Sequence, residues 1–267
     1  MSDLERWIEL VPTGQTATPS FWWSGLRLVQ SAEKLQKLQT LLAELVAGWQ
    51  THPVARIRRD AGLDFRAVEL ENPEGDIQPE HKREASLLAS ELLFHVRTAL
   101  DYAVYQAAWR NSGQRQQRTA FPLCLVEEAW PRRRRDDLKG LSQAHIELIE
   151  KAQPFNGVGW TLSLASLSNR DKHRTAVEVT PTYGFKVDLG KRWTDPLGDD
   201  AYYGLQIENP KIRCLLIPEG EEPSEIGIPA VEALAEILDG AARLVNIFLS
   251  EEGQPLVQIT YGPVTGS

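Results

Sequence analysis

One long amphipathic segment, residues 79–111, limits most strongly what this chain can fold into. Its apolar side chains recur every three or four positions, which predicts a single helix about 50 Å long. Pro79 suits the first turn of a helix, and Asn111 with Gly113 suits its end. The length and the period of this segment predict the central helix of a helical bundle.

Other segments also have the pattern or composition of helices. In chain order, they are residues 24–49, 141–155, 159–174 and 228–250. Helix 159–174 is apolar on nearly all sides before its last turn, so we expect it to be buried in the bundle. Helix 228–250 carries an apolar face that needs the same bundle to cover it.

Before the last helix the pattern changes. Short β-branched or aromatic runs bounded by Gly, Pro and Asp occupy residues 175–218, and residues 63–71 alternate in a similar way. These runs predict an antiparallel sheet of three to five short strands. The predicted fold class is therefore α+β, a helical bundle with an appended sheet.

We expect residues 1–267 to form a single α+β domain. The helical core would comprise about 24–174 and 228–250, and the sheet region about 175–218. The last helix follows the strands but should pack on helices that precede them, which favours one domain over two.

Composition excludes several classes of protein. The net charge of −8 argues against nucleic-acid binding driven by overall charge. Cys124 and Cys214 lack the spacing of a zinc site, which argues against a cysteine-based zinc site. The sequence also has no Gly-rich motif for a nucleotide phosphate, and no cofactor is expected. The sequence has no apolar run that would span a bilayer and no signal-peptide core near its start. We expect a cytoplasmic protein without a membrane partner.

The positive charge is concentrated in one stretch. Arg110 to Lys139 holds eight basic residues against four acidic ones, including the run Arg132, Arg133, Arg134 and Arg135. This patch is either a site that meets the phosphates of RNA or of a nucleotide, or a solvated loop.

Helix 79–111 carries the first group of candidate site residues. Glu91 and His95 are four positions apart and share a face, while Arg97 lies one turn from Asp101 and can pair with it. Near neutral pH a histidine can serve as acid, base or metal ligand. The group is either a polar site inside the bundle, or a surface face with an Arg–Asp pair that holds helices together.

The second group ends helix 159–174. Six polar residues, Asn169 to Arg174, follow its apolar part. Basic side chains complement the dipole at a helix C-terminus, so Lys172, His173 and Arg174 could be ordinary helix-end charges. Asp171 is expected to point inward, where a carboxylate requires a partner. We expect the two groups to meet in one polar site.

Four segments occur in an order that resembles a family of uncharacterised bacterial proteins: ELLFHVRTALDYAVYQ, FPL, IEKAQPF and WTLSLASLSNRDKHR. The resemblance covers about residues 80–180 and implies site candidates but no reaction. His95 fits a position that is often polar in this family. The positions that match its motif are Glu91, Arg97, Asp101, Asn169, Asp171, Lys172, His173 and Arg174.

The chain resembles HEPN domains more loosely. These are helical bundles of bacterial toxins and phage defence, and those that cut RNA do so without metal, using an Arg and a His with four to six residues between them. Here Arg170 and His173 are closer together than that pattern requires. An RNA-cleaving member would therefore assign the roles differently: His173 as proton carrier, Arg174 and Arg97 as phosphate ligands, Asn169 and Asp171 as orienting groups.

Three hypotheses for the function remain open. The first is a HEPN-like protein that acts on RNA or nucleotide phosphate in bacterial defence. The second is a non-catalytic interaction module, which could form a homodimer, whose Arg97–Asp101 and Asp171–Arg174 pairs fix the helix register. The third is a metal-dependent hydrolase, with ligands from Glu91, His95, Asp171 and His173.

Overall fold

The computed structural model describes residues 20–49, 54–59, 66–71, 79–173, 177, 179–194, 201–216, 228–251, 253 and 256–259. Side chains are described for residues 20–44, 80–168, 177, 179, 230–251, 253 and 256–259.

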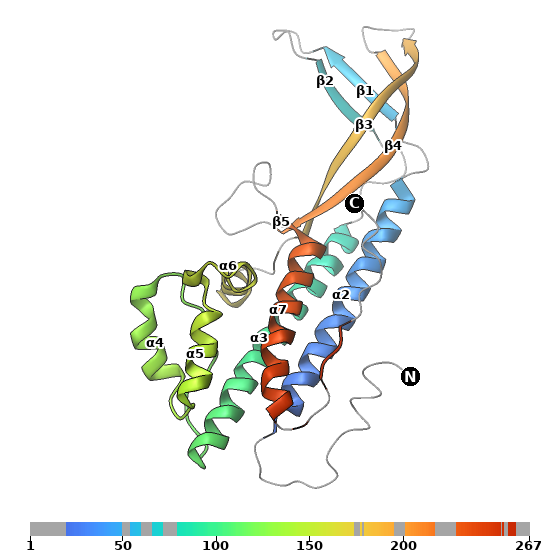
Figure 1. The fold of residues 1–267 in the computed structure, drawn as a ribbon. Helices are drawn as coiled ribbons and strands as arrows, with labels where there is room; N and C mark the ends of the chain where they lie inside the picture. Colours follow the sequence, from blue (N-terminus) through green and yellow to red (C-terminus); the bar gives the residue numbers. More distant parts are fainter. Residues whose placement is uncertain are drawn as a thin grey trace.

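Three long helices form the centre of the molecule. They are α2 (Trp22–Trp49), α3 (Pro79–Ser112) and α7 (Ala230–Glu251), and they lie side by side in Figure 1. Each of the three contacts the other two. None of the described helices is both long and apolar enough to cross a membrane.

The core lies between these helices. On α3 the buried side chains include Leu92, Val96, Ala99 and Ala103, which recur at helical spacing on one side. Several of them are alanines, which allow the neighbouring helices to approach closely. Each larger apolar side chain buried here contributes about 1.5–3 kcal/mol to stability. The large buried side chains of the neighbouring helices include Leu28, Leu35 and Leu38 of α2 and Leu234, Ile237, Leu238 and Phe248 of α7.

Shorter helices lie on one side of the three long ones (Figure 1). In chain order they are the 3₁₀ turn η1 (Glu127–Ala129), α4 (Trp130–Asp137), α5 (Gln143–Lys151), the 3₁₀ turn η2 (Pro154–Asn156) and α6 (Gly159–His173). A polar contact joins these shorter helices to the long ones. Nε2 of His145 on α5 lies 3.0 Å from a carboxylate oxygen of Glu251 on α7.

Gly240 fixes how α6 packs on α7. A Cβ at this glycine would lie closer than 3.0 Å to three ring atoms of Trp160, so the absence of a side chain makes room for the indole. The Trp160 ring in turn stacks on Phe121, with 6.4 Å between centroids. The segment around Phe121 is therefore held between α6 and the central helices.

The backbone also traces a set of antiparallel strands beyond one end of the helices (Figure 1). The strand order is β2-β1-β4-β3, and β5 pairs with β4. Their bounds are β1 (Val54–Arg59), β2 (Arg66–Glu71), β3 (Val179–Thr194), β4 (Ala201–Leu216) and β5 (Ile228–Pro229). Two hydrogen bonds tie the start of β3 to α3: the N–H groups of Val177 and Val179 donate to the hydroxyls of Ser90 and Ser86.

The α+β class predicted from the sequence is wrong. Helix accounts for 78% of the residues whose side chains are described, and the class that these residues support is helical, without a sheet. The physical reason is that the long helices cover one another's apolar faces, so the core closes without a sheet. Local alternation in short segments predicts strand conformation but not whether strands build the core. The expectation of a single domain stays a prediction.

Candidate functional site

The polar residues of α3 lie on two sides of the helix. Glu91 and His95 share one face, whereas Arg97 and Asp101 lie six positions further on, which corresponds to about 240° of rotation. Glu91 forms an ion pair with Lys34 of α2. The face of Glu91 and His95 therefore meets α2, and the other pair meets a different part of the chain.

His95 takes part in a polar contact between α2 and α3. Its Nδ1 lies 3.1 Å from Nη1 of Arg27, which also donates to Oε1 of Gln30. Burial lowers the pKa of His95, and the charges of Arg27 and Lys34 lower it further, while Glu91 acts in the opposite direction. Near neutral pH the imidazole is therefore uncharged, and its Nδ1 accepts a hydrogen bond from Arg27.

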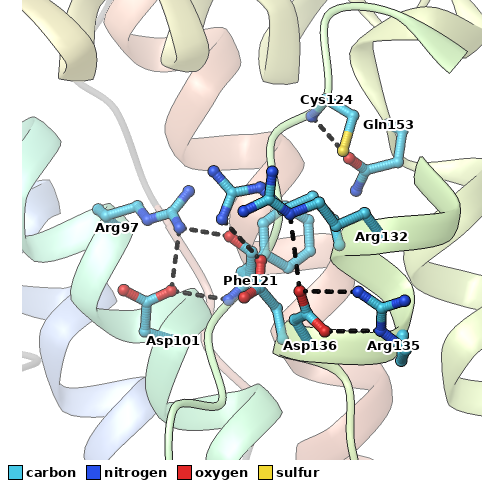
Figure 2. Close-up of polar contacts among 10 residues, drawn as sticks. Arg97, Asp101, Phe121, Cys124, Arg132, Arg135, Asp136 and Gln153 are labelled. Carbon is cyan, nitrogen blue, oxygen red and sulfur yellow. Dashed lines mark hydrogen bonds and ion pairs between the residues drawn. The ribbon is translucent and has the colours of Figure 1, made fainter. Parts of the chain in front are cut away.

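Arg97 and Asp101 hold the backbone of Phe121, as Figure 2 shows. Arg97 Nη2 donates to the carbonyl oxygen of Phe121, and the N–H of Phe121 donates to Oδ1 of Asp101 at 2.8 Å. The two side chains also pair with each other, with 3.3 Å from Nη2 to Oδ1. We call these two side chains and the Phe121 backbone the Phe121 clasp. Hydrogen bonds to charged groups are the stronger kind, so the clasp fixes this segment on α3.

A buried glutamine, Gln153, holds the backbone of the segment that follows Phe121. Oε1 of Gln153 accepts from the N–H of Cys124 at 3.0 Å (Figure 2), and its Nε2 donates to the carbonyl of Ile149. The side chain is fully buried, so both of its polar atoms need these partners. Burial also raises the pKa of the Cys124 thiol.

Sequence reasoning did not single out Gln153. The available signal was a polar residue between Ala152 and Pro154 in a segment that otherwise belongs to the core.

The second group of candidates, residues 169–174, lies outside the described side chains. The backbone of α6 is helical through Asn169, Asp171 and His173, but their side chains are not described, and Arg174 lies outside the described residues. The predicted meeting of the two groups therefore stays a prediction.

The basic run forms a helix. On α4, Arg132 pairs with Asp136 at 3.7 Å and Arg133 with Asp137 at 3.2 Å, each one turn apart. Arg134 instead donates to the amide oxygen of Gln143 on α5. Arg135 pairs with Asp136, which gives that carboxylate two arginine neighbours (Figure 2).

A groove of about 470 Å³ opens between α4 and α5. The residues that line it include Trp130, Arg134, Arg135, Lys139, Ile146 and Glu150. The indole N–H of Trp130 is buried and has no acceptor among the described residues. Among the described residues, neither Lys139 nor the carboxylate of Glu150 makes a hydrogen bond or an ion pair within the protein.

In the part of the chain with described residues, no three His, Cys, Asp or Glu residues gather as a metal site. Comparison of the sequence and the fold with models of known protein families, with curated proteins and with solved structures found no match. The relation to the bacterial family and to HEPN domains therefore stays a resemblance of short segments.

Proposed function

We propose that this chain is a non-catalytic helical interaction module that binds a phosphate-bearing partner, RNA or a nucleotide, through the basic face of α4. This face comprises Arg132, Arg133, Arg134 and Arg135 of α4 together with Lys139, which follows the helix. The observation that carries the proposal is the Phe121 clasp, in which Arg97 and Asp101 are occupied by the backbone of Phe121.

The contacts on α3 support a structural role for its polar residues. Both contacts of Arg97 use Nη2, and only 15% of its side chain is exposed, so little of the guanidinium is open to a substrate phosphate. A general acid must present a proton within hydrogen-bond reach of its substrate. The pKa of His95 is lowered, and its Nδ1 faces the Arg27 donor instead.

The charges on α4 support a phosphate-bearing partner. Guanidinium groups match the geometry of phosphate oxygens, and an ammonium group adds a mobile positive charge. Arg134 and Lys139 have no carboxylate partner among the described residues. Because the whole chain carries a net charge of −8, attraction is confined to this face and should weaken as salt increases.

The experiment measures binding and cleavage of an end-labelled single-stranded RNA, and binding of ADP, by the full chain. We expect binding that weakens with salt, without RNA cleavage. A variant with Arg132→Gln, Arg133→Gln, Arg134→Gln and Lys139→Gln should lose binding. A control variant removes the same number of charges at exposed sites elsewhere: Lys37→Gln, Lys82→Gln, Arg83→Gln and Arg243→Gln. It should bind like the wild type.

The catalytic hypothesis makes the opposite prediction. If His173 carries a proton in RNA cleavage, the wild type degrades the labelled RNA and His173→Ala does not, with the same melting temperature. That result would replace the module proposal. A chain that binds neither RNA nor ADP would also contradict it.

A further inference from the structure

We infer that the groove between α4 and α5 is a site for a single nucleotide, a nucleoside mono- or diphosphate, rather than for a strand of RNA. This inference rests on the proposed function, because it names the ligand that the basic face of α4 would take. Three features support it: the basic side chains that line the groove, the acidic residues near them in the sequence, and the apolar and carboxylate groups of the remaining lining.

The basic side chains of α4 are not equivalent. Arg132 is highly exposed, with 83% of its side chain accessible, and pairs with Asp136, while Arg133 pairs with Asp137. Arg134 and Lys139 line the groove and are not neutralised by a carboxylate among the described residues. The uncompensated positive charge of α4 is therefore concentrated at the groove, where a phosphate group would meet it.

Acidic residues flank this positive charge in the sequence. Exposed Glu127 and Glu128 precede α4, Asp136 and Asp137 end it, and exposed Glu147 lies on α5. Proteins that bind single-stranded nucleic acid track several successive phosphates with a continuous basic groove. Here carboxylates interrupt the basic residues along the chain, before α4, at its end and on α5. The arrangement therefore favours a ligand whose charge is confined to one end.

The other lining residues suit the uncharged part of a nucleotide. Pro131 and the partly exposed Ile146 supply apolar surface, against which a base can pack. Glu150 has a carboxylate without a partner among the described residues, and a carboxylate accepts hydrogen bonds from ribose hydroxyls or base amino groups. At about 470 Å³, the groove is in the size range of small-molecule sites.

A nucleotide is the ligand class that uses both halves of this lining. Inorganic phosphate would engage only Arg134, Arg135 and Lys139, and an uncharged nucleoside would engage only Glu150 and the apolar surface. We therefore expect ADP or AMP to bind more tightly than phosphate or adenosine alone. This difference separates recognition of the whole nucleotide from attraction of any anion to a basic helix.

Calorimetric titration of the full chain with AMP, ADP, adenosine, inorganic phosphate and a ten-nucleotide single-stranded RNA tests the inference. We expect a Kd below about 1 mM for AMP or ADP. Arg134→Gln and Lys139→Gln should each weaken nucleotide binding by about fivefold or more, and Glu150→Gln by about threefold. Lys82→Gln removes one exposed positive charge on α3, outside the basic face, and should change the Kd less than about twofold. Lys82, Arg134 and Lys139 are exposed and Glu150 is only partly buried, so each variant should melt like the wild type.

Three outcomes would overturn the inference. Nucleotide binding that survives both Arg134→Gln and Lys139→Gln would place the ligand elsewhere. RNA binding that is tighter than nucleotide binding, and that Arg132→Gln weakens as much as Arg134→Gln, would overturn the groove but leave the proposed function intact. Absence of binding by every probe would overturn both.

Discussion

Asp101 accepts a 2.8 Å hydrogen bond from the backbone N–H of Phe121, twenty residues further along the chain. The same carboxylate pairs with Arg97, which donates to the carbonyl of Phe121. Both backbone groups of one residue are thus held by two side chains one turn apart on α3. This arrangement makes the pair a device for positioning a segment of chain, and it leads to the first prediction.

Replacing Asp101 by Ala should destabilise the fold. The substitution removes a charged acceptor and leaves the Phe121 N–H without its partner, at a cost of about 1.5–3 kcal/mol in the free energy of unfolding. Urea denaturation measures this difference. Asp136→Ala is the matched control, because it removes an exposed carboxylate that also pairs with arginine, and it should leave stability nearly unchanged. Equal stability of the two variants would contradict a structural role for Asp101.

Stability should depend on pH through His95. Its pKa is below the ordinary value of 6.5 in the folded protein, so the unfolded chain binds a proton more readily. The contribution of the neutral imidazole is therefore fully present above about pH 6.5 and is lost as the pH falls through the lowered pKa. Comparing the melting temperatures of the wild type and of His95→Gln between pH 5 and 8 isolates the stability that the neutral imidazole contributes. The two curves should converge toward low pH, and parallel curves would show that His95 does not contribute.

Adding a methyl group at Gly240 should destabilise the packing of α6 on α7. Alanine is favoured over glycine inside a helix by about 1 kcal/mol, so Gly240→Ala would stabilise an uncrowded helix. Here the new Cβ overlaps the Trp160 ring, and overpacking typically costs about 1–3 kcal/mol. We therefore expect a lower melting temperature for Gly240→Ala. The same substitution in a Trp160→Leu background should be neutral or stabilising, and a persistent penalty there would contradict the predicted contact.

The thiol of Cys124 should react slowly in the folded protein. The side chain is buried, and burial raises its pKa, so little of the reactive thiolate is present near neutral pH. The rate of modification by a water-soluble disulfide reagent, measured in a Cys214→Ser background, should rise sharply when denaturant is added. A rate that is already that of a free thiol in native buffer would show that the segment after Phe121 opens readily.

The helices could be predicted well because each carries an apolar face at helical spacing. Pro79 marks the start of α3 in the structure as it does in the sequence, and α2 and α7 differ from their predicted bounds by only two residues. The fold class was not predictable from the same patterns. Alternation between residues 175 and 218 indicates strand conformation, but the elements that bury the core decide the class, and those are helices.

The helix α4 shows a limit of apolar periodicity. Residues 131–135 contain no apolar stripe, so the sequence left open a solvated loop. The helix forms with Pro131 near its start and with Arg–Asp pairs one turn apart, Arg132 with Asp136 and Arg133 with Asp137. The spacing of the charges was the available signal.

The candidate site was predictable only in part. Spacing on α3 correctly indicated that Arg97 can pair with Asp101, and the ion pair is present. It did not indicate Phe121 as the partner of Arg97 and Asp101. The two side chains bind the backbone N–H and C=O of Phe121, and every residue has a backbone C=O and nearly every one an N–H, so the residue type at position 121 carries no signal of this contact. The groove likewise depends on α5 lying against α4, which no sequence spacing specifies.

The central claim is that the polar residues of α3 stabilise the fold, whereas the basic residues at the groove bind a nucleotide. One comparison tests it most directly: the melting temperature and the nucleotide Kd of Asp101→Asn beside those of Lys139→Gln. We predict that Asp101→Asn lowers the melting temperature but binds nucleotide like the wild type, and that Lys139→Gln melts like the wild type but binds more weakly. An Asp101→Asn protein that melts like the wild type and no longer binds nucleotide would contradict the account.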